Sequence, residues 1–139
     1  KLELKTAKIE DYYKFSHELG VSQIDNAKLQ NKIFGIECNF EELNGIDFKK
    51  GCYVGQENTA RIKLKNKLSK RLLPIEIIEG KLLEDEIIYN NDVEIGKVLI
   101  NEEYPFALIK YLNENFDKDH TFKSESGSFK ILIPEWLKV

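Results

Sequence analysis

The stretch "KRLLPIEIIE", residues 70–79, decides the fold class, because from Ser69 onward apolar side chains recur with a period close to two. Five further stretches of the same kind follow, separated by turn residues such as Gly80 and Ser126-Gly127. They are "DEIIYN" (85–90), "VEIGKVLIN" (93–101), "YPFALIKYL" (104–112), "HTFKSES" (120–126) and "SFKILIP" (128–134). Six short strands in about 65 residues predict a small closed or nearly closed antiparallel β-barrel, which leaves no free sheet edge.

Upstream of this region the pattern is mixed α/β. Apolar residues between Ile9 and Leu19 recur at helical spacing, with Thr6 as a candidate N-cap and Gly20 as a left-handed C-cap. A short helix capped by Asn39 and another over residues 54–62 are also expected. The prediction is therefore an α+β fold of two parts, an α/β part over residues 1–66 and a barrel over residues 67–139.

Composition narrows the class of protein. The 139 residues are 42% hydrophobic and 32% charged, as in a globular domain, and no apolar run approaches membrane-spanning length. There is no methionine at all, which predicts a piece of a longer chain. Two cysteines and two histidines give neither a disulfide framework nor zinc-ligand spacing, so no metal site and a reducing compartment are expected.

Charge is concentrated in one basic band over residues 49–71, where eight basic side chains and one acidic side chain give a net charge of +7. The flanking segments are acidic, at −3 before the band and −7 after it. Such a band can attract phosphate, polyglutamate or RNA, or it can be a solvated linker. The sequence leaves both interpretations open.

The band begins with "KKGCYVGQENTAR", residues 49–61, which contains the candidate functional thiol. Lys49 and Lys50 precede Cys52, and a helix starting near Val54 would point its N–H groups at the thiol, so both features favour thiolate. The alternative is a turn in which Gly51 supplies the backbone angle and Cys52 is small filler. Cys38 and His17 are expected to have packing roles.

The pattern K-G-C-Y-x-G-Q-E-x-x-x-R resembles the signature of the YgfZ-type folate-binding proteins, relatives of the glycine cleavage T-protein, an aminomethyltransferase. It is carried here by Lys50, Gly51, Cys52, Tyr53, Gly55, Gln56, Glu57 and Arg61. The likeness extends to "YYKFSHELGV" (12–21), to residues 35–61 and to "KRLLPIEI" (70–77). These stretches resemble the iron–sulfur cluster assembly branch of the family.

The resemblance implies the C-terminal half of a protein about twice as long, ending in the barrel. It implies a tetrahydrofolate-dependent accessory factor for [4Fe–4S] assembly or repair, with an indirect effect on tRNA modification and with Cys52 as the functional residue. Folate, iron–sulfur assembly proteins and client enzymes are the implied partners, with much of the pterin pocket supplied by the other half. The location would be the bacterial cytoplasm or the mitochondrial matrix.

Two other functions remain open. One is a true folate-dependent aminomethyltransferase, against which the residues around Cys52 argue. The other is a nucleic-acid-binding barrel that uses the basic band, for which Tyr53 is the one aromatic residue available for stacking. An acidic barrel also argues against direct nucleic-acid binding.

Overall fold

The computed structural model describes residues 6–51, 57–64, 69–110 and 120–137. The helical elements are α1 (Ile9–Glu18), the 3-10 turn η1 (Asn26–Leu29) and α2 (Glu57–Leu64). The strands are β1 (Lys70–Gly80), β2 (Ile87–Asn90), β3 (Val93–Ile100), β4 (Phe106–Lys110), β5 (Thr121–Lys123) and β6 (Gly127–Ile131). Each of the six predicted strand stretches overlaps one of these strands, so the α+β class with a barrel is confirmed.

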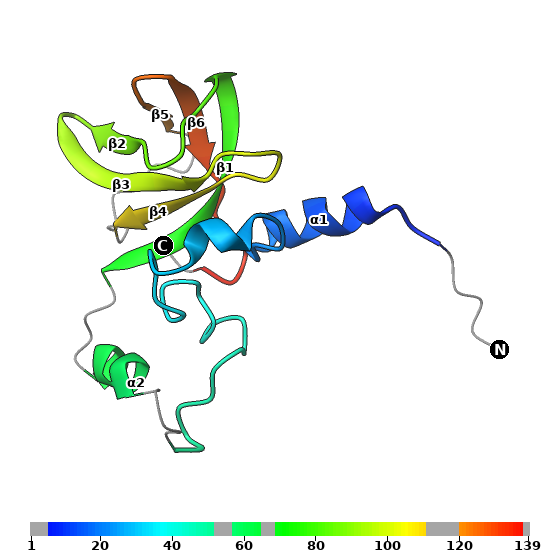
Figure 1. Cartoon of the computed structure of the whole chain (residues 1–139), viewed down its shortest axis with the longest axis vertical. Coiled ribbons are helices and arrows are strands. Elements are labelled where there is room, and N and C mark those ends of the chain that lie inside the picture. The colour runs from blue at the N-terminus through cyan, green and yellow to red at the C-terminus, as the bar shows by residue number, and fades with distance from the viewer. Residues whose placement is uncertain (1–5, 52–56, 65–68, 111–119, 138–139) are drawn as a thin grey trace.

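The strands form a closed barrel in the order β1-β4-β3-β2-β5-β6, and every neighbouring pair is antiparallel (Figure 1). The long strand β1 closes it, because Lys70–Pro74 pair with β4 and Ile75–Gly80 pair with β6. Pro74, which has no N–H to donate, stands where β1 changes partner. Its carbonyl accepts from Leu132 N–H at 2.9 Å, so the changeover itself is hydrogen bonded.

Two apolar clusters form the core. The first fills the barrel with side chains from all six strands and contains Phe122 and Phe129. The second lies under the helical segment and contains Leu72, Leu99, Ile100, Phe106 and Leu108. Leu29, Ile33 and Cys38 from the preceding part of the chain pack against this second cluster. The α/β segment is therefore attached to the barrel by shared apolar burial.

Helix α1 is fixed to the barrel at its C-terminal end, and in Figure 1 its other end extends away from the strands. The helix ends as predicted, since Gly20 adopts φ +74° and its N–H donates to the His17 carbonyl at 2.8 Å. Trp136 Nε1 donates to the Leu19 carbonyl at 2.8 Å. The predicted Thr6 cap is wrong, because Lys8 is the N-cap residue and the helix begins at Ile9.

Asn39 also has a different role from the predicted one. Residues 34–44 form consecutive turns in place of a helix, and Asn39 has φ 62°, in the left-handed region that asparagine tolerates. Asn44, with φ 59°, ends the turns, and the Gly45 N–H donates to the Phe40 carbonyl at 2.6 Å. Within the part of the chain that is described, neither α1 nor α2 has the length and apolar character needed to cross a bilayer.

Candidate functional site

The structure describes half of the predicted signature. Lys50, Gly51, Glu57 and Arg61 are among the described residues, and all four are exposed. Cys52, Tyr53, Gly55 and Gln56 lie outside the described residues. The position of the Cys52 thiol relative to α2, and its functional role, therefore stay predictions.

The loop that leads into the signature has an ordered turn and an open backbone. The Lys49 N–H donates to Asp47 Oδ1 at 2.8 Å, an Asx-type turn. Gly51 follows with φ +87°, and a Cβ built on it would have no heavy atom within 4 Å. Gly51 is thus required for its backbone angle and not for close packing, which leaves the backbone open to a ligand or partner.

Helix α2 presents the rest of the described signature. Glu57 is in its first turn, where a negative charge is favourable, and Arg61 lies one turn later on the same side. The helix is held by Lys63, whose ammonium is 2.6 Å from Glu41 Oε1 and 5.7 Å from the centre of the Phe48 ring. Lys63 belongs to the basic band, and its charge is already paired with Glu41 within the chain.

A polar network at the start of β1 was not predicted from the sequence. The Asn39 amide is fully buried, donates to the Leu72 carbonyl at 2.7 Å and accepts from Arg71 Nη1 at 3.0 Å. Arg71 Nη2 is 2.6 Å from Glu42 Oε1. The network therefore joins the turns of residues 34–44 to the barrel close to the signature helix.

The electrostatics of this network follow from its burial. Burial by itself raises the pKa of Glu42, but the hydrogen bond and charge of Arg71 outweigh it, so the pKa is lowered. Glu42 Oε2 and Arg71 Nε are buried and have no partner among the described residues. Arg71 is a partly buried cation that is already paired with Glu42, so the basic band offers less charge to an anion than the sequence suggests.

Cys38 is a packing residue, as predicted. It lies against the second apolar cluster, and burial together with the charge of Glu37 raises the pKa of its thiol to about 11. A thiol with that pKa is almost entirely protonated at neutral pH and is a poor nucleophile or metal ligand. If one of the two cysteines acts chemically, the physics of Cys38 leaves Cys52 as the candidate.

Beside Cys38 lies an apolar cleft of about 380 Å³ between η1, the following turns and Leu72. Its walls include Leu29, Ile33 and Phe40, and three polar side chains stand in its lining, Ser22, Asn26 and Gln30. The lining carries no ionisable group other than the Cys38 thiol and no signature residue. A charged glutamate tail has no cationic partner there, so this cleft by itself does not fit a folate.

No group of three or more His, Cys, Asp or Glu side chains within the described ranges could hold a metal ion. The chemistry available here is therefore that of an exposed loop and helix, next to an uncharged cleft and fixed to the barrel by the partly buried ion pair of Arg71 and Glu42.

Comparison with known proteins points to one functional class. No protein-family model matches the chain. Over 61 residues it is 38% identical to "Iron-sulfur cluster assembly factor IBA57 homolog, mitochondrial" of Aspergillus oryzae, a match that covers 44% of the chain and 14% of that protein. It is 35% identical over 74 residues to the mouse factor of that name, covering 53% of the chain and 20% of the relative.

The Dictyostelium discoideum homolog is 35% identical over 92 residues, which is 63% of the chain and 22% of that protein. The chain thus spans about a fifth or less of the length of the curated relatives it matches. Over about half of its residues, it is similar to iron–sulfur cluster assembly factors that are named as mitochondrial.

Proposed function

We propose that the protein containing this chain supports the assembly of iron–sulfur clusters, with the signature loop and α2 as its working surface. The observation that supports this proposal is the 35–38% identity to assembly factors of fungi, mouse and Dictyostelium. The exposed loop at Gly51 and the exposed Glu57 and Arg61 give that surface access to a partner.

Cys52 is proposed as the functional thiol of this surface. The support is indirect: Cys38 is excluded by its raised thiol pKa, whereas Cys52 follows the two exposed lysines Lys49 and Lys50. Positive charge favours the thiolate, which is the form that reacts or binds metal. A single cysteine needs ligands from a partner to hold a cluster, so an accessory role is proposed in place of a scaffold role.

The test is complementation in cells that lack their own factor of this kind, with the full-length protein and its Cys52→Ala and Cys38→Ala variants. The readout is the activity of a [4Fe–4S] enzyme normalised to its protein level. Cys52→Ala is expected to lose complementation, whereas Cys38→Ala keeps it. Complementation by Cys52→Ala equal to that of the unchanged protein would contradict the proposal.

Dependence on tetrahydrofolate is a separate part of the proposal and rests on the resemblance of the signature. The apolar cleft beside Cys38 does not fit a folate, so the pocket is proposed to need the rest of the longer protein together with Lys50 and Arg61. Calorimetric titration of the full-length protein with tetrahydrofolate is expected to show saturable binding that Arg61→Ala weakens. Absence of binding would remove the folate part and leave the assembly function standing.

Two further features belong to the same proposal. An effect on tRNA modification would be indirect, through iron–sulfur enzymes that modify tRNA, and would therefore disappear together with [4Fe–4S] activity in the Cys52→Ala variant. The relatives are named as mitochondrial, so the mitochondrial matrix is the proposed location in a eukaryotic cell. A fluorescent fusion of the full-length protein tests the location.

A further inference from the structure

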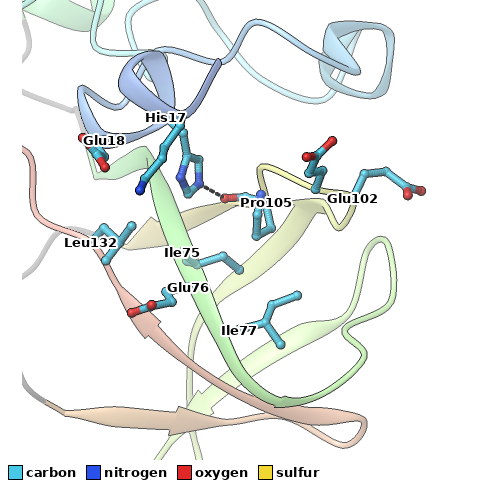
Figure 2. Close-up of a pocket in the computed structure, with 10 residues that line it drawn as sticks. His17, Glu18, Ile75, Glu76, Ile77, Glu102, Pro105 and Leu132 are labelled. Atoms are coloured by element: carbon cyan, nitrogen blue, oxygen red, sulfur yellow. Dashed lines mark hydrogen bonds between the residues drawn. The ribbon is translucent and has the colours of Figure 1, made fainter. Parts of the chain in front are cut away.

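A second cleft, whose lining contains no signature residue, is not used by the proposed function. It has a volume of about 580 Å³ and is formed by α1, β1 and the turn before β4. Figure 2 shows Glu18 and Glu76 toward one end of this cleft and Glu102 toward the other, with Ile75 and Ile77 of β1 between them. The cleft therefore has negatively charged ends and an apolar middle.

His17 defines the hydrogen-bonding character of the cleft wall. Its side chain is 9% exposed, and its ring stands edge-on to Phe106 at a centroid distance of 5.0 Å. Its Nε2 lies 2.9 Å from the Pro105 carbonyl oxygen, which can only accept, so Nε2 carries the proton (Figure 2). Burial lowers the pKa of His17, so the ring is neutral at pH 7.

The other ring nitrogen, Nδ1, is then a hydrogen-bond acceptor to which no described group donates. A neutral histidine protonated at Nε2 has a lone pair on Nδ1, and Nδ1 has no hydrogen bond to any described residue. His17 is part of the cleft lining, so this lone pair can accept a hydrogen bond from a ligand in the cleft. The polar atom that this side chain offers the cleft is an acceptor.

The carboxylates add acceptors of the same kind. Glu18 and Glu76 form no ion pair with any described residue, whereas Glu102 is 3.2 Å from Lys28 Nζ. Lys14 is the one cation in the lining, against four carboxylates. Apart from Lys14, the ionisable side chains of the lining are His17 and the four glutamates, and all of them accept hydrogen bonds.

The spacing of these groups excludes a compact ligand. The carboxylates and His17 do not form a group that could hold a metal ion, as judged on the described residues. An elongated cation suits the arrangement better, because its methylene groups can lie on Ile75 and Ile77 while its nitrogen atoms reach the ends. Both ammonium and guanidinium groups carry only donors, which matches the acceptors that Glu18, Glu76 and His17 present to the cleft.

We propose that this cleft binds an aliphatic chain that ends in ammonium or guanidinium groups, held by Glu18 and Glu76, with a donor from the ligand to His17 Nδ1. The same chemistry occurs in a free polyamine and in the lysine or arginine side chains of a basic segment of a partner protein. This site is distinct from the signature loop and does not depend on the iron–sulfur proposal.

The test uses the 139-residue chain and two probes, spermidine and an acetylated tetralysine peptide, followed by NMR at low salt. Saturable shifts are expected at Ile75, Ile77 and the His17 ring, and the ¹⁵N signal of Nδ1 is expected to move as it accepts a hydrogen bond. The Kd is expected to rise about fivefold in the Glu18→Gln/Glu76→Gln double variant and to rise with added salt.

The matched control is Glu79→Gln, on the same strand as Glu76, exposed and outside the cleft lining. It is expected to leave the Kd within the error of the measurement. Binding of spermidine alone would identify a free polyamine as the ligand, and tighter binding of the peptide would identify a protein segment. Equal weakening by Glu79→Gln, an unmoved Nδ1 signal at saturation, or no saturation with either probe would overturn the proposal.

Discussion

The buried Asn39 amide joins the Leu72 carbonyl to the guanidinium of Arg71. It donates to the Leu72 carbonyl and accepts from Arg71, and its backbone is in the left-handed region. Helix capping was the role expected from the sequence, because asparagine favours caps and turns. The distant partners could not be predicted, since nothing local places residue 39 beside residues 71 and 72.

Asn39→Ala is expected to lower the free energy of unfolding by about 3 kcal/mol, because it removes the hydrogen bonds to the Leu72 carbonyl and to Arg71 Nη1, while Arg71 Nη2 keeps Glu42. Asn44→Ala is the control, since Asn44 also has a left-handed backbone but is exposed. The control should cost about 1 kcal/mol, the price of the backbone angle alone. Urea unfolding measures both, and equal losses would show that the network contributes nothing.

Gly80 and Gly51 form a second matched pair, with φ +81° and +87°. A methyl group at Gly80 would overlap the Ser126 carbonyl oxygen where β1 meets β6, whereas one at Gly51 would meet open space. Gly80→Ala is therefore expected to cost about 3 kcal/mol or more, and Gly51→Ala about 1 kcal/mol. Thermal unfolding of the two variants measures the difference, and similar melting temperatures would contradict the role given to Gly80 in barrel closure.

At the scale of elements, the turn between β5 and β6 is fastened by a carboxylate from the turn before β2. Glu86 accepts from the Leu83 N–H at 2.8 Å, from the Ser126 N–H at 2.9 Å and from the Ser126 hydroxyl. Burial raises the pKa of Glu86, but these hydrogen bonds outweigh it and lower the pKa to about 2. One side chain thereby ties together two turns that lie 40 residues apart in the chain.

This arrangement predicts a specific loss of stability in acid. A carboxyl group with a lowered pKa contributes fully above its ordinary value of 4.5, and the contribution disappears as the pH falls from 4.5 through about 2. Because the side chain is partly exposed, about 1 kcal/mol is expected.

Urea midpoints measured between pH 5 and pH 2 should fall less steeply for Glu86→Gln than for the unchanged chain. Glu125→Gln, at an exposed neighbour of Ser126, should keep the original slope. If the pH dependence of the urea midpoint is reduced equally in both variants, Glu86 is not the group responsible for the loss of stability in acid.

The strands themselves could be predicted from sequence, and the reason is local. Thr121, Phe122 and Lys123 alternate between exposed polar and buried apolar side chains, and this period is visible without knowing which strand lies alongside. Gly20 was predictable for a similar reason, since a glycine after a helical run marks its end. The strand order, in which β1 pairs with both β4 and β6, depends on long-range contacts. The sequence therefore predicted a barrel but not the order of its strands.

For the candidate site, the sequence predicted which residues belong to the signature but not what surrounds them. Arg71 was counted as part of a basic band, and its ion pair with Glu42 is visible only in the fold. His17 was expected to be a packing residue, which it is, but its bond to Pro105 spans 88 positions. Chemistry made by residues distant in sequence is the part that motif reading does not supply.

At the scale of the whole molecule, the barrel has one core of its own and one that it shares. The shared cluster contains Leu72, Leu99 and Phe106, covered by Leu29 and Ile33 from the preceding segment. The fragment 67–139 is therefore expected to keep its β-sheet circular dichroism but to lose at least about 3 kcal/mol of stability and to bind a hydrophobic dye. A fragment as stable as the full chain would show that the two parts fold independently.

Two consecutive glutamates form ion pairs with residues of α2 and β1. Glu41 pairs with Lys63 of α2, and Glu42 pairs with Arg71 of β1. In polymer terms, Lys63 and Arg71 are both tethered to this one pair of glutamates, so the length of chain between Lys63 and Arg71 is only weakly linked to stability. Doubling the length of such a loop costs about 0.6 kcal/mol. Four glycine or serine residues inserted there should change the unfolding free energy by about that amount, and this connection is the natural place for a reporter tag.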